Sequence, residues 1–345
     1  MRVVAIGGGT GLSTLLKGLK RYGLPPGWLS HAPCPLPFQW LDVTAIVTVT
    51  DDGGSTGRLR REFGMQAPGD IRNCMVALSE DSDLLAQLFN YRFDAGRGLK
   101  GHSFGNLFLT AMTRITGDFA DAVRLSSEVL SISGRIYPST QANVRLRAHL
   151  QNGEVVDGES RISKSTSPID RVELQPKQCA PLAGAIEAIR RADVITLGPG
   201  SLYTSVVPNL LVRGVASAIR KSRAIKACIV NLMWQPGETS GMTASDHIAA
   251  IHAHARQPFV DYAIVNTEPI TAPQRRRYAE ASARPVEVDT ERLKQLGVKL
   301  LTYDLVAPGN KVRHDSVKLA EIVLQLAKKG RRLQLQPAAA ESRRK

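Results

Sequence analysis

The sequence predicts an α/β protein, with a Rossmann-like, doubly wound and mostly parallel sheet and a small β-rich insertion. Short β-branched runs, such as VTAIVTVT at residues 43–50, are typical of parallel strands covered on both faces. Helical patterns alternate with these runs, which favours helices on both faces of one sheet. Glycine clusters follow two of the runs, at residues 7–11 and 198–201, where a doubly wound fold gathers its ligand site.

The elements follow from these patterns in chain order. The first unit reads as a strand over residues 2–6, a glycine turn and a helix over residues 12–21. The remaining strands are expected at residues 43–50, 193–197, 224–231 and 262–266. The remaining helices are expected at residues 73–93, 106–115, 121–130, 183–191, 208–221, 244–255 and 316–329.

Three segments interrupt the alternation. Residues 23–40 hold five prolines, which block both helix and central strand, so we expect a surface loop inserted there. Residues 131–172 look strand-rich, and their Asn152-Gly153 pair predicts a hairpin turn, so this segment is interpreted as a small β-rich insertion. Residues 330–345 form a basic tail that we expect to be disordered, which leaves residues 1–329 as a single domain.

The composition of the chain favours some classes of function and argues against others. The chain has 345 residues and a net charge of +14, of which residues 328–345 carry +6; the +8 on the rest of the chain suits an anionic small ligand. No RNA- or DNA-binding motif is visible and aromatic residues make up only 5%, which argues against nucleic acid as the main partner. No apolar run approaches the ~20 residues of a membrane helix, and the N-terminus does not read as a signal peptide. Four scattered cysteines without CxxC spacing indicate free thiols, so we expect a cytoplasmic protein.

Two glycine turns are candidate phosphate sites. Glycine lets a backbone N–H approach an oxygen closely, and a helix N-terminus adds unpaired N–H groups. The dinucleotide fingerprint GxGxxG fails because position 12 is Leu12, and the P-loop fails because the nearest lysine, Lys17, lies six residues beyond Gly11. The alternative is that the turn at residues 7–11 is a tight turn that holds no ligand, but four glycines in five positions exceed what such a turn requires.

Polar clusters follow the second strand and begin two helices. In TDDGGSTGRLRREFG, Asp51 and Asp52 are suited to Mg²⁺ or a ribose hydroxyl, or else belong to a solvated loop. PGDIRN at residues 68–73 and GHSFGNL at residues 101–107 place polar residues at helix starts. Capping and ordinary polar packing explain several of these residues as well as a ligand does; Asp70 on this reading is a helix N-cap.

These motifs, with ADVITLGPGSLYTSVVPNLLV and NLMWQPGET, resemble the YvcK-like family of gluconeogenesis factors over residues 1–329. That family is related to the 2-phospho-L-lactate transferases (CofD), which join a phospholactyl group to a deazaflavin with Mg²⁺. The resemblance implies a protein that binds UDP-sugars, notably UDP-N-acetylglucosamine, and is linked to cell shape, cell-wall precursor supply and growth on gluconeogenic carbon. It implies ligand contacts from Tyr278 and Arg313, and a regulatory hydroxyl at Ser316, where some members carry a phosphorylated threonine.

The leading reading is a UDP-sugar-binding regulator, with cell-wall regulatory proteins as partners and a homodimer as the assembly. No nucleophile–base pair is obvious, so no catalytic residue is predicted. The predicted ligand contacts are Gly8, Gly9, Thr10, Gly11, Asp51, Asp52, Ser55, Arg58, Arg72, Asn73, His102, Asn106, Gly200, Ser201, Asn209, Tyr278 and Arg313.

The rival reading is an Mg²⁺-dependent transferase in which Asp51 and Asp52 hold the metal. A third reading, nucleic-acid association through the tail, predicts binding that is lost when residues 330–345 are deleted.

Overall fold

A computed structural model describes residues 1–23, 40–79, 83–280 and 282–336 of the chain. Its centre is a seven-stranded sheet in the order β10-β9-β8-β7-β1-β2-β3, in which every neighbouring pair is parallel. The strands are β1 Arg2–Gly7, β2 Asp42–Val47, β3 Arg135–Pro138, β7 Val194–Leu197, β8 Ile225–Ile229, β9 Tyr262–Asn266 and β10 Lys299–Tyr303. The predicted doubly wound fold is confirmed.

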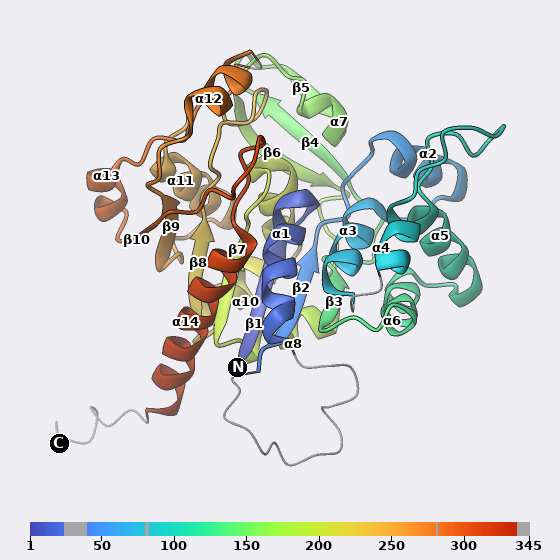
Figure 1. The fold of residues 1–345 in the computed structure, drawn as a ribbon, viewed down its shortest axis with the longest axis horizontal. Coiled ribbons are helices and arrows are strands. Elements are labelled where there is room, and N and C mark those ends of the chain that lie inside the picture. The colour runs from blue at the N-terminus through green and yellow to red at the C-terminus, as the bar shows by residue number, and fades with distance from the viewer. Residues whose placement is uncertain (24–39, 80–82, 281, 337–345) are drawn as a thin grey trace.

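Helices cover both faces of the sheet. On one face α1, α3 and α14 pack together, and on the other α8, α9 and α10 do so (Figure 1). The helices are α1 Gly9–Leu19, α2 Gly54–Phe63, α3 Gly69–Leu78, α4 Asp83–Asn90, α5 Phe104–Thr116, α6 Phe119–Val129, α7 Glu159–Ile162, α8 Ala183–Arg191, α9 Val207–Leu211, α10 Val215–Lys221, α11 Ala244–Ala255, α12 Ala272–Ala279, α13 Thr290–Gln295 and α14 Ser316–Leu335. A 3-10 turn, Lys20–Tyr22, follows α1, and a π-helical turn, Leu202–Val206, precedes α9.

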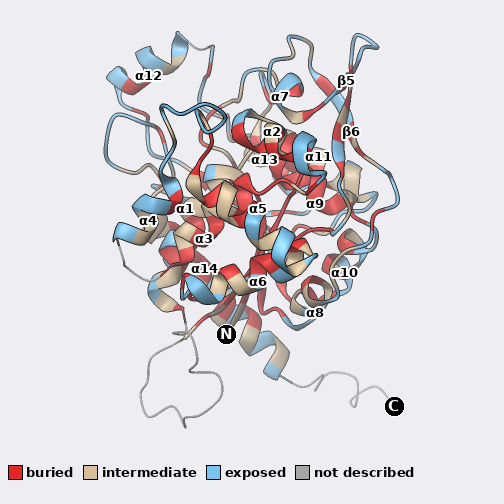
Figure 2. Cartoon of the chain, turned by 90° about the vertical axis from the view of Figure 1, so that its right-hand side faces the viewer, coloured by how far each residue is buried: buried red, intermediate tan, exposed pale blue. Residues whose placement is uncertain are grey.

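The core lies between the sheet and these helices. Figure 2 shows buried residues along the strands and exposed ones on the outward sides of the helices. β1 illustrates the cause, since Val3, Val4, Ala5 and Ile6 are all buried in a strand flanked by β2 and β7. Because a central parallel strand has no solvent face, its sequence is apolar throughout and not alternating.

A separate three-stranded antiparallel sheet has the order β5-β4-β6, with β4 Arg145–Leu150, β5 Val155–Asp157 and β6 Ile169–Gln175. Gly153 has a φ of +87° in the β4–β5 turn, as the Asn-Gly pair predicts. The predicted insertion over residues 131–172 is wrong at both ends. β3 belongs to the main sheet, where Thr44 pairs with Arg135, and the small sheet extends to Gln175.

Several predicted boundaries also need correction. The helix expected over residues 73–93 is two helices, α3 and α4. The helix expected over residues 208–221 breaks between α9 and α10, where Gly214 has a φ of +85°. The expected basic tail loses its first six residues to α14, which continues through Leu335. Residues 337–345 lie outside the described residues, as does the proline-rich segment 24–39, whose flanks Gly23 and Leu41 form a parallel bridge.

Two further observations concern the packing and the composition of the helices. The start of α14 packs tightly on α1, because a Cβ at Gly18 would collide with the carbonyl oxygen of Ser316. Within the described part of the chain, no single helix is long and apolar enough to cross a membrane. One bent pair, Leu202–Leu211 with Val215–Lys221, passes by length and composition alone.

Candidate functional site: a cavity at the switch point of the sheet

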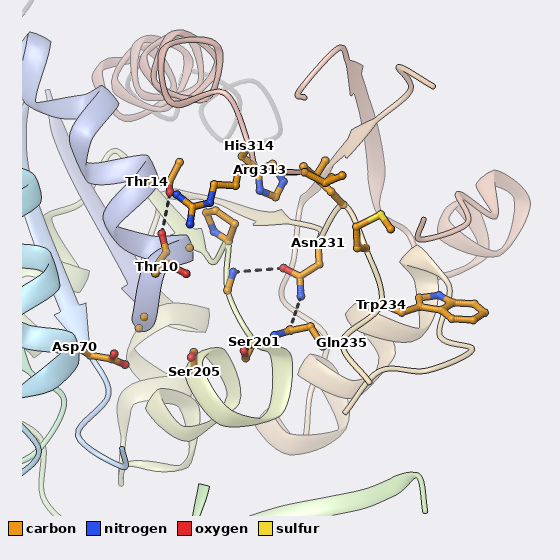
Figure 3. A pocket seen from close by; sticks show the side chains of 18 of the residues that line it. Thr10, Thr14, Asp70, Ser201, Ser205, Asn231, Trp234, Gln235, Arg313 and His314 are labelled. Carbon is orange, nitrogen blue, oxygen red and sulfur yellow. Dashed lines mark hydrogen bonds between the residues drawn. The ribbon is translucent and has the colours of Figure 1, made fainter. Parts of the chain in front are cut away.

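Strand order reverses between β1 and β7, and a cavity of about 360 Å³ opens beside their carboxyl ends. This is the crevice in which doubly wound proteins place their ligands. We call it the switch-point cavity (Figure 3). Its lining residues come from four chain segments and from three single positions, Asp70, Glu159 and Tyr278. They are Gly8, Gly9, Thr10, Gly11, Thr14, Asp70, Glu159, Pro199, Gly200, Ser201, Ser205, Asn231, Leu232, Met233, Trp234, Gln235, Tyr278, Val312, Arg313 and His314.

The first glycine bend opens the N-terminus of α1 into the cavity. Gly8 is extended, Gly9 has a φ of +61°, and no side chain caps the helix. The first-turn N–H groups of a helix have no partner within it, and they carry the positive end of the helix dipole. The bend therefore presents donors suited to an anion.

The second glycine bend touches the first. Gly198 and Gly200 have φ values of +78° and +150°, which only glycine adopts readily. A Cβ at Gly11 would collide with the carbonyl oxygen of Pro199, and one at Gly200 would lie 3.3 Å from the carbonyl oxygen of Gly8. The two bends converge on one cavity, as the sequence led us to expect, because each lacks the side chains that would separate them.

A polar chain holds the second bend in place. The Asn231 side chain accepts a 3.4 Å hydrogen bond from the Gly200 N–H and donates to the Gln235 amide oxygen at 3.1 Å. Gln235 in turn donates to the Ser201 hydroxyl at 2.6 Å. Figure 3 shows these side chains along one wall of the cavity. The loop after β8 therefore fixes the backbone of the bend after β7.

Tyr278 and Arg313, distant in sequence, close another wall. The Tyr278 hydroxyl accepts a hydrogen bond of 3.0 Å from the Val312 N–H, which joins α12 to the segment before α14. His314 contacts the Val230 carbonyl at 3.2 Å, and burial lowers its pKa to about 4, so the imidazole is neutral at physiological pH. The exposed Arg313 therefore carries the positive charge of this wall.

Three of the remaining predicted contacts form a buried network elsewhere, between α2 and the start of α5. Ser55 Oγ lies 3.0 Å from His102 Nδ1, and Asn106 Nδ2 donates to Ser55 Oγ at 3.2 Å. Burial and the nearby Arg58 guanidinium lower the pKa of His102. We call Ser55, His102 and Asn106 the α2–α5 cluster. It does not line the switch-point cavity.

The charged side chains around this cluster form hydrogen bonds with backbone groups of the protein. Asp51 accepts the Gly53 N–H and Asp52 accepts the Ser160 N–H, each at 2.9 Å. The Arg58 guanidinium donates to the Lys100 carbonyl at 2.8 Å. Neither aspartate lines the cavity. Among the described residues no group of three or more His, Cys, Asp or Glu side chains is placed to hold a metal ion.

Four further predicted residues, Arg72, Asn73, Asn209 and Ser316, do not line the cavity. The Arg72 guanidinium donates to the Asn73 side chain at 2.5 Å, and burial lowers the pKa of Arg72. Asn209 is fully buried and donates to the carbonyls of Gly7 and Ser205 at 3.2 and 2.8 Å, so it supports the first bend from beneath. Ser316 is the first residue of α14 and does not line the cavity.

Sequence reasoning missed several lining residues. The interpretation of Asp70 as an N-cap is wrong, because Pro68 holds that position and Asp70 lies in the first turn of α3. Asn231 and Gln235 both lie within NLMWQPGET, a motif that indicates the family resemblance but no role for these residues. Glu159 had no local signal, because only the path of the small sheet brings α7 to the cavity.

Fold and cavity together define a doubly wound α/β protein with a glycine-lined, polar pocket at its switch point. Comparison with known proteins gives the particular family. Residues 3–306 match the family described as 2-phospho-L-lactate transferase CofD. A gluconeogenesis factor from Halalkalibacterium halodurans is 48% identical over 94% of this chain and 95% of its own length.

A gluconeogenesis factor from Bacillus subtilis is 46% identical over 95% of this chain and 98% of its own length. A crystal structure of a UPF0052 family protein from Bacillus halodurans superimposes with a TM-score of 0.86 at 48% identity. The match covers 94% of this chain and 98% of that one. The chain belongs to the YvcK-like gluconeogenesis factor family, which is related to CofD.

Proposed function

We propose that this gluconeogenesis factor family member is a regulatory protein that binds a UDP-sugar, with UDP-N-acetylglucosamine as its ligand, in the switch-point cavity. One observation carries the proposal: two glycine bends from distant parts of the chain meet and line one cavity, into which the N-terminus of α1 opens. A diphosphate is the chemical group that a glycine-lined helix N-terminus suits best.

The side chains around the bends fit the rest of such a ligand. Arg313 can add charge-assisted hydrogen bonds to the diphosphate, worth about 1.5–3 kcal/mol each. Tyr278 lines the same cavity, and its ring can stack on the uracil or the sugar for about 1 kcal/mol. Because its hydroxyl already accepts the Val312 N–H, the position of the ring is fixed before any ligand arrives.

We extend the proposal to a role in the cell because the relatives are described as gluconeogenesis factors. On this proposal the protein acts in the cytoplasm, as a homodimer. It supports growth on gluconeogenic carbon and regulates cell shape and cell-wall precursor supply through cell-wall regulatory proteins. Phosphorylation of Ser316 would modulate it, since this residue opens α14 against α1.

Titration calorimetry tests the binding step directly. UDP-N-acetylglucosamine should bind to the full chain with heat that NAD and ATP do not match. Arg313→Ala should weaken this binding about 10- to 100-fold. Absence of heat with the UDP-sugar, or equal heat with all three ligands, would reject the proposal.

A second candidate is an Mg²⁺-dependent phospholactyl transferase that uses a nucleotide diphosphate donor. The match to the CofD family favours it. The predicted metal ligands do not fit well, because Asp51 and Asp52 lie outside the cavity and accept separate backbone N–H groups. Transfer to a deazaflavin acceptor that Asp52→Asn abolishes would support this candidate, and no product at high enzyme concentration would end it.

A further inference from the structure

A second cavity, of about 550 Å³, lies away from the glycine bends. It opens between the segment after β6, the turn that joins α9 to α10, and the end of α11. We call it the basic cavity, because Lys177, Arg213 and Arg256 line it and no described aspartate or glutamate does so. A cavity with positive charges and no acid in its lining attracts an anion.

Two of the three cations in this lining are available to a ligand. Lys177 Nζ lies 2.8 Å from Glu173 Oε2, so its charge is already paired. Arg213 and Arg256 are exposed, and their side chains form no hydrogen bond or ion pair with any described residue. A guanidinium group has five N–H donors in a planar fork that matches the geometry of a phosphate group. The donors of both arginines therefore remain free at the basic cavity.

The backbone at Arg256 gives an independent indication. This residue is the C-cap of α11 and has a left-handed conformation, with a φ of +61° and a ψ of 10°. Glycine is the usual residue at such a helix end, because a side chain there is strained. A basic side chain can also stabilise a helix end by donating to its last carbonyls, but that of Arg256 donates to none among the described residues. The strain therefore indicates a role for the side chain outside the helix itself.

Hydrogen bonds fasten the walls of the basic cavity to one another. His254 Nε2 accepts the Val172 N–H at 3.1 Å, which joins α11 to β6, and Nδ1 lies 2.7 Å from the Ala250 carbonyl oxygen. Because Nε2 accepts, the imidazole is neutral and adds no charge. The Arg213 N–H donates to the Cys179 carbonyl at 3.1 Å, which joins the turn after α9 to the segment after β6. The walls are therefore in place before a ligand binds.

An adjoining cavity, of about 520 Å³, continues from the basic cavity along β6. The two cavities share four lining residues, which are Lys177, Leu211, His254 and Arg256. The adjoining cavity also has two carboxylates, Asp170 and Glu173, which are paired with Arg171 and Lys177. Carboxylates accept hydrogen bonds from hydroxyl groups and repel a second anion. The two cavities together suit a molecule with an anionic group at one end and hydroxyl groups at the other.

We propose that the basic cavity is a second ligand site, which binds the phosphate group of a small sugar phosphate through Arg213 and Arg256. A phosphate monoester carries nearly two negative charges at neutral pH and three acceptor oxygens, which two guanidinium groups can bind together. The sugar hydroxyls then extend into the adjoining cavity toward Asp170 and Glu173. This inference goes beyond the UDP-sugar proposal and does not depend on it, because neither cavity shares a lining residue with the switch-point cavity.

Titration of ribose 5-phosphate with the full chain, followed by phosphorus NMR at neutral pH, tests the inference. We expect saturable binding in the millimolar range or tighter. Inorganic phosphate should bind at least about threefold more weakly, because it cannot also reach the adjoining cavity. Ribose should not compete, because it has no charge for the two arginines.

Two variants test the arginines. Arg256→Gly should weaken the binding of ribose 5-phosphate at least about tenfold. Its melting temperature should stay the same or rise, because glycine adopts the left-handed conformation without strain. A purely structural role of Arg256 would instead lower the melting temperature. Arg213→Gln should weaken binding by a similar factor.

Two further variants serve for comparison. Arg220→Gln removes an exposed arginine of α10 that lines neither part of the proposed site, and it should keep the affinity within about twofold. Arg313→Ala tests whether the phosphate occupies the switch-point cavity instead. Thermal melting monitors the folding of each variant.

Each other outcome overturns the inference. These outcomes are no saturable binding, retained affinity in Arg213→Gln or Arg256→Gly, and an equal loss in Arg220→Gln, which would indicate unspecific attraction to a basic surface. A loss in Arg313→Ala alone would place the phosphate at the glycine bends. Equal affinity for inorganic phosphate would overturn the assignment to a sugar phosphate. The UDP-sugar proposal is unaffected by these results, since titration with UDP-N-acetylglucosamine tests it separately.

Discussion

The switch-point cavity and the α2–α5 cluster look alike in sequence but differ in structure. Each follows a glycine-rich stretch at the carboxyl edge of the sheet. In the cluster, Ser55, His102 and Asn106 form hydrogen bonds with one another and do not line the cavity. In the cavity, Gly8 provides no side-chain cap for α1, and both glycine bends line open space. A glycine-rich polar motif therefore indicates a ligand site only where its residues line a cavity and do not fill it by binding one another.

Gly11→Ala should have the largest effect, because the added methyl group collides with the Pro199 carbonyl and separates the two bends. We expect at least about a 100-fold loss of affinity for the UDP-sugar, together with about 1–3 kcal/mol of stability from overpacking. Calorimetry and thermal melting measure the two effects.

The matched control for this change is Gly53→Ala, next to the α2–α5 cluster. Gly53 has a φ of −82°, and a Cβ there meets only the Asp51 carboxylate at 3.3 Å. It should change affinity less than about threefold. Equal losses in both variants would contradict the distinction between the two regions.

Arg313→Ala compares the charged groups of the two regions. Arg313 is exposed in the cavity wall and should supply about 1.5–3 kcal/mol of ligand binding with little effect on melting temperature. Arg58→Ala removes a guanidinium that already donates to the Lys100 carbonyl, and we expect unchanged affinity. If Arg58→Ala weakened binding as much as Arg313→Ala, the α2–α5 region would belong to the ligand site.

Asn106→Ala should act on stability alone. Its side chain donates to Ser55 Oγ and, at 3.4 Å, to Thr56 Oγ1, both of which are buried. The loss of these hydrogen bonds should cost about 1 kcal/mol of unfolding free energy. Chemical denaturation measures it, and titration of the UDP-sugar should give the affinity of the unaltered protein. A selective loss of affinity would reverse this assignment.

Ser316→Glu should have the smallest effect. A negative charge on the first residue of α14 interacts favourably with the helix dipole, for about 0.3–1 kcal/mol of added stability at low salt. High salt should screen most of the gain. Ser316→Ala serves as the uncharged control, and a destabilised Ser316→Glu would show that the contact with α1 at Gly18 dominates.

The sequence supports prediction of the central strands and both bends, because a buried parallel strand and a glycine turn leave strong local patterns. It gives weaker signals elsewhere. β10 is an edge strand with a half-exposed surface, and α12 carries the sequence APQRRRYA, which has no apolar face. The sequence pattern places β3 in the wrong sheet, because the pairing of Thr44 with Arg135 is set by contacts remote in the chain.

The residues of the candidate site also differ in how well the sequence predicts them. The glycines of the bends were found from their own neighbours in the sequence. Tyr278 and Arg313 entered through the family resemblance, and both line the cavity. The pattern at Asp70 is that of a helix cap, and Glu159 falls inside the predicted β-rich insertion over residues 131–172, so neither pattern indicates a place in the cavity. Their places in the lining depend on contacts remote in the chain, which no local pattern records.

The pairing of β1 with β7 has a consequence for how the molecule holds together. Arg2 and Asp193 are 191 positions apart, yet the N–H of Arg2 donates to the Asp193 carboxylate at 2.7 Å. The two bends beyond these strands belong to halves of the chain that are joined along this line. A molecule bound across both bends would link the two halves of the chain, so ligand binding would protect the protein against unfolding and proteolysis.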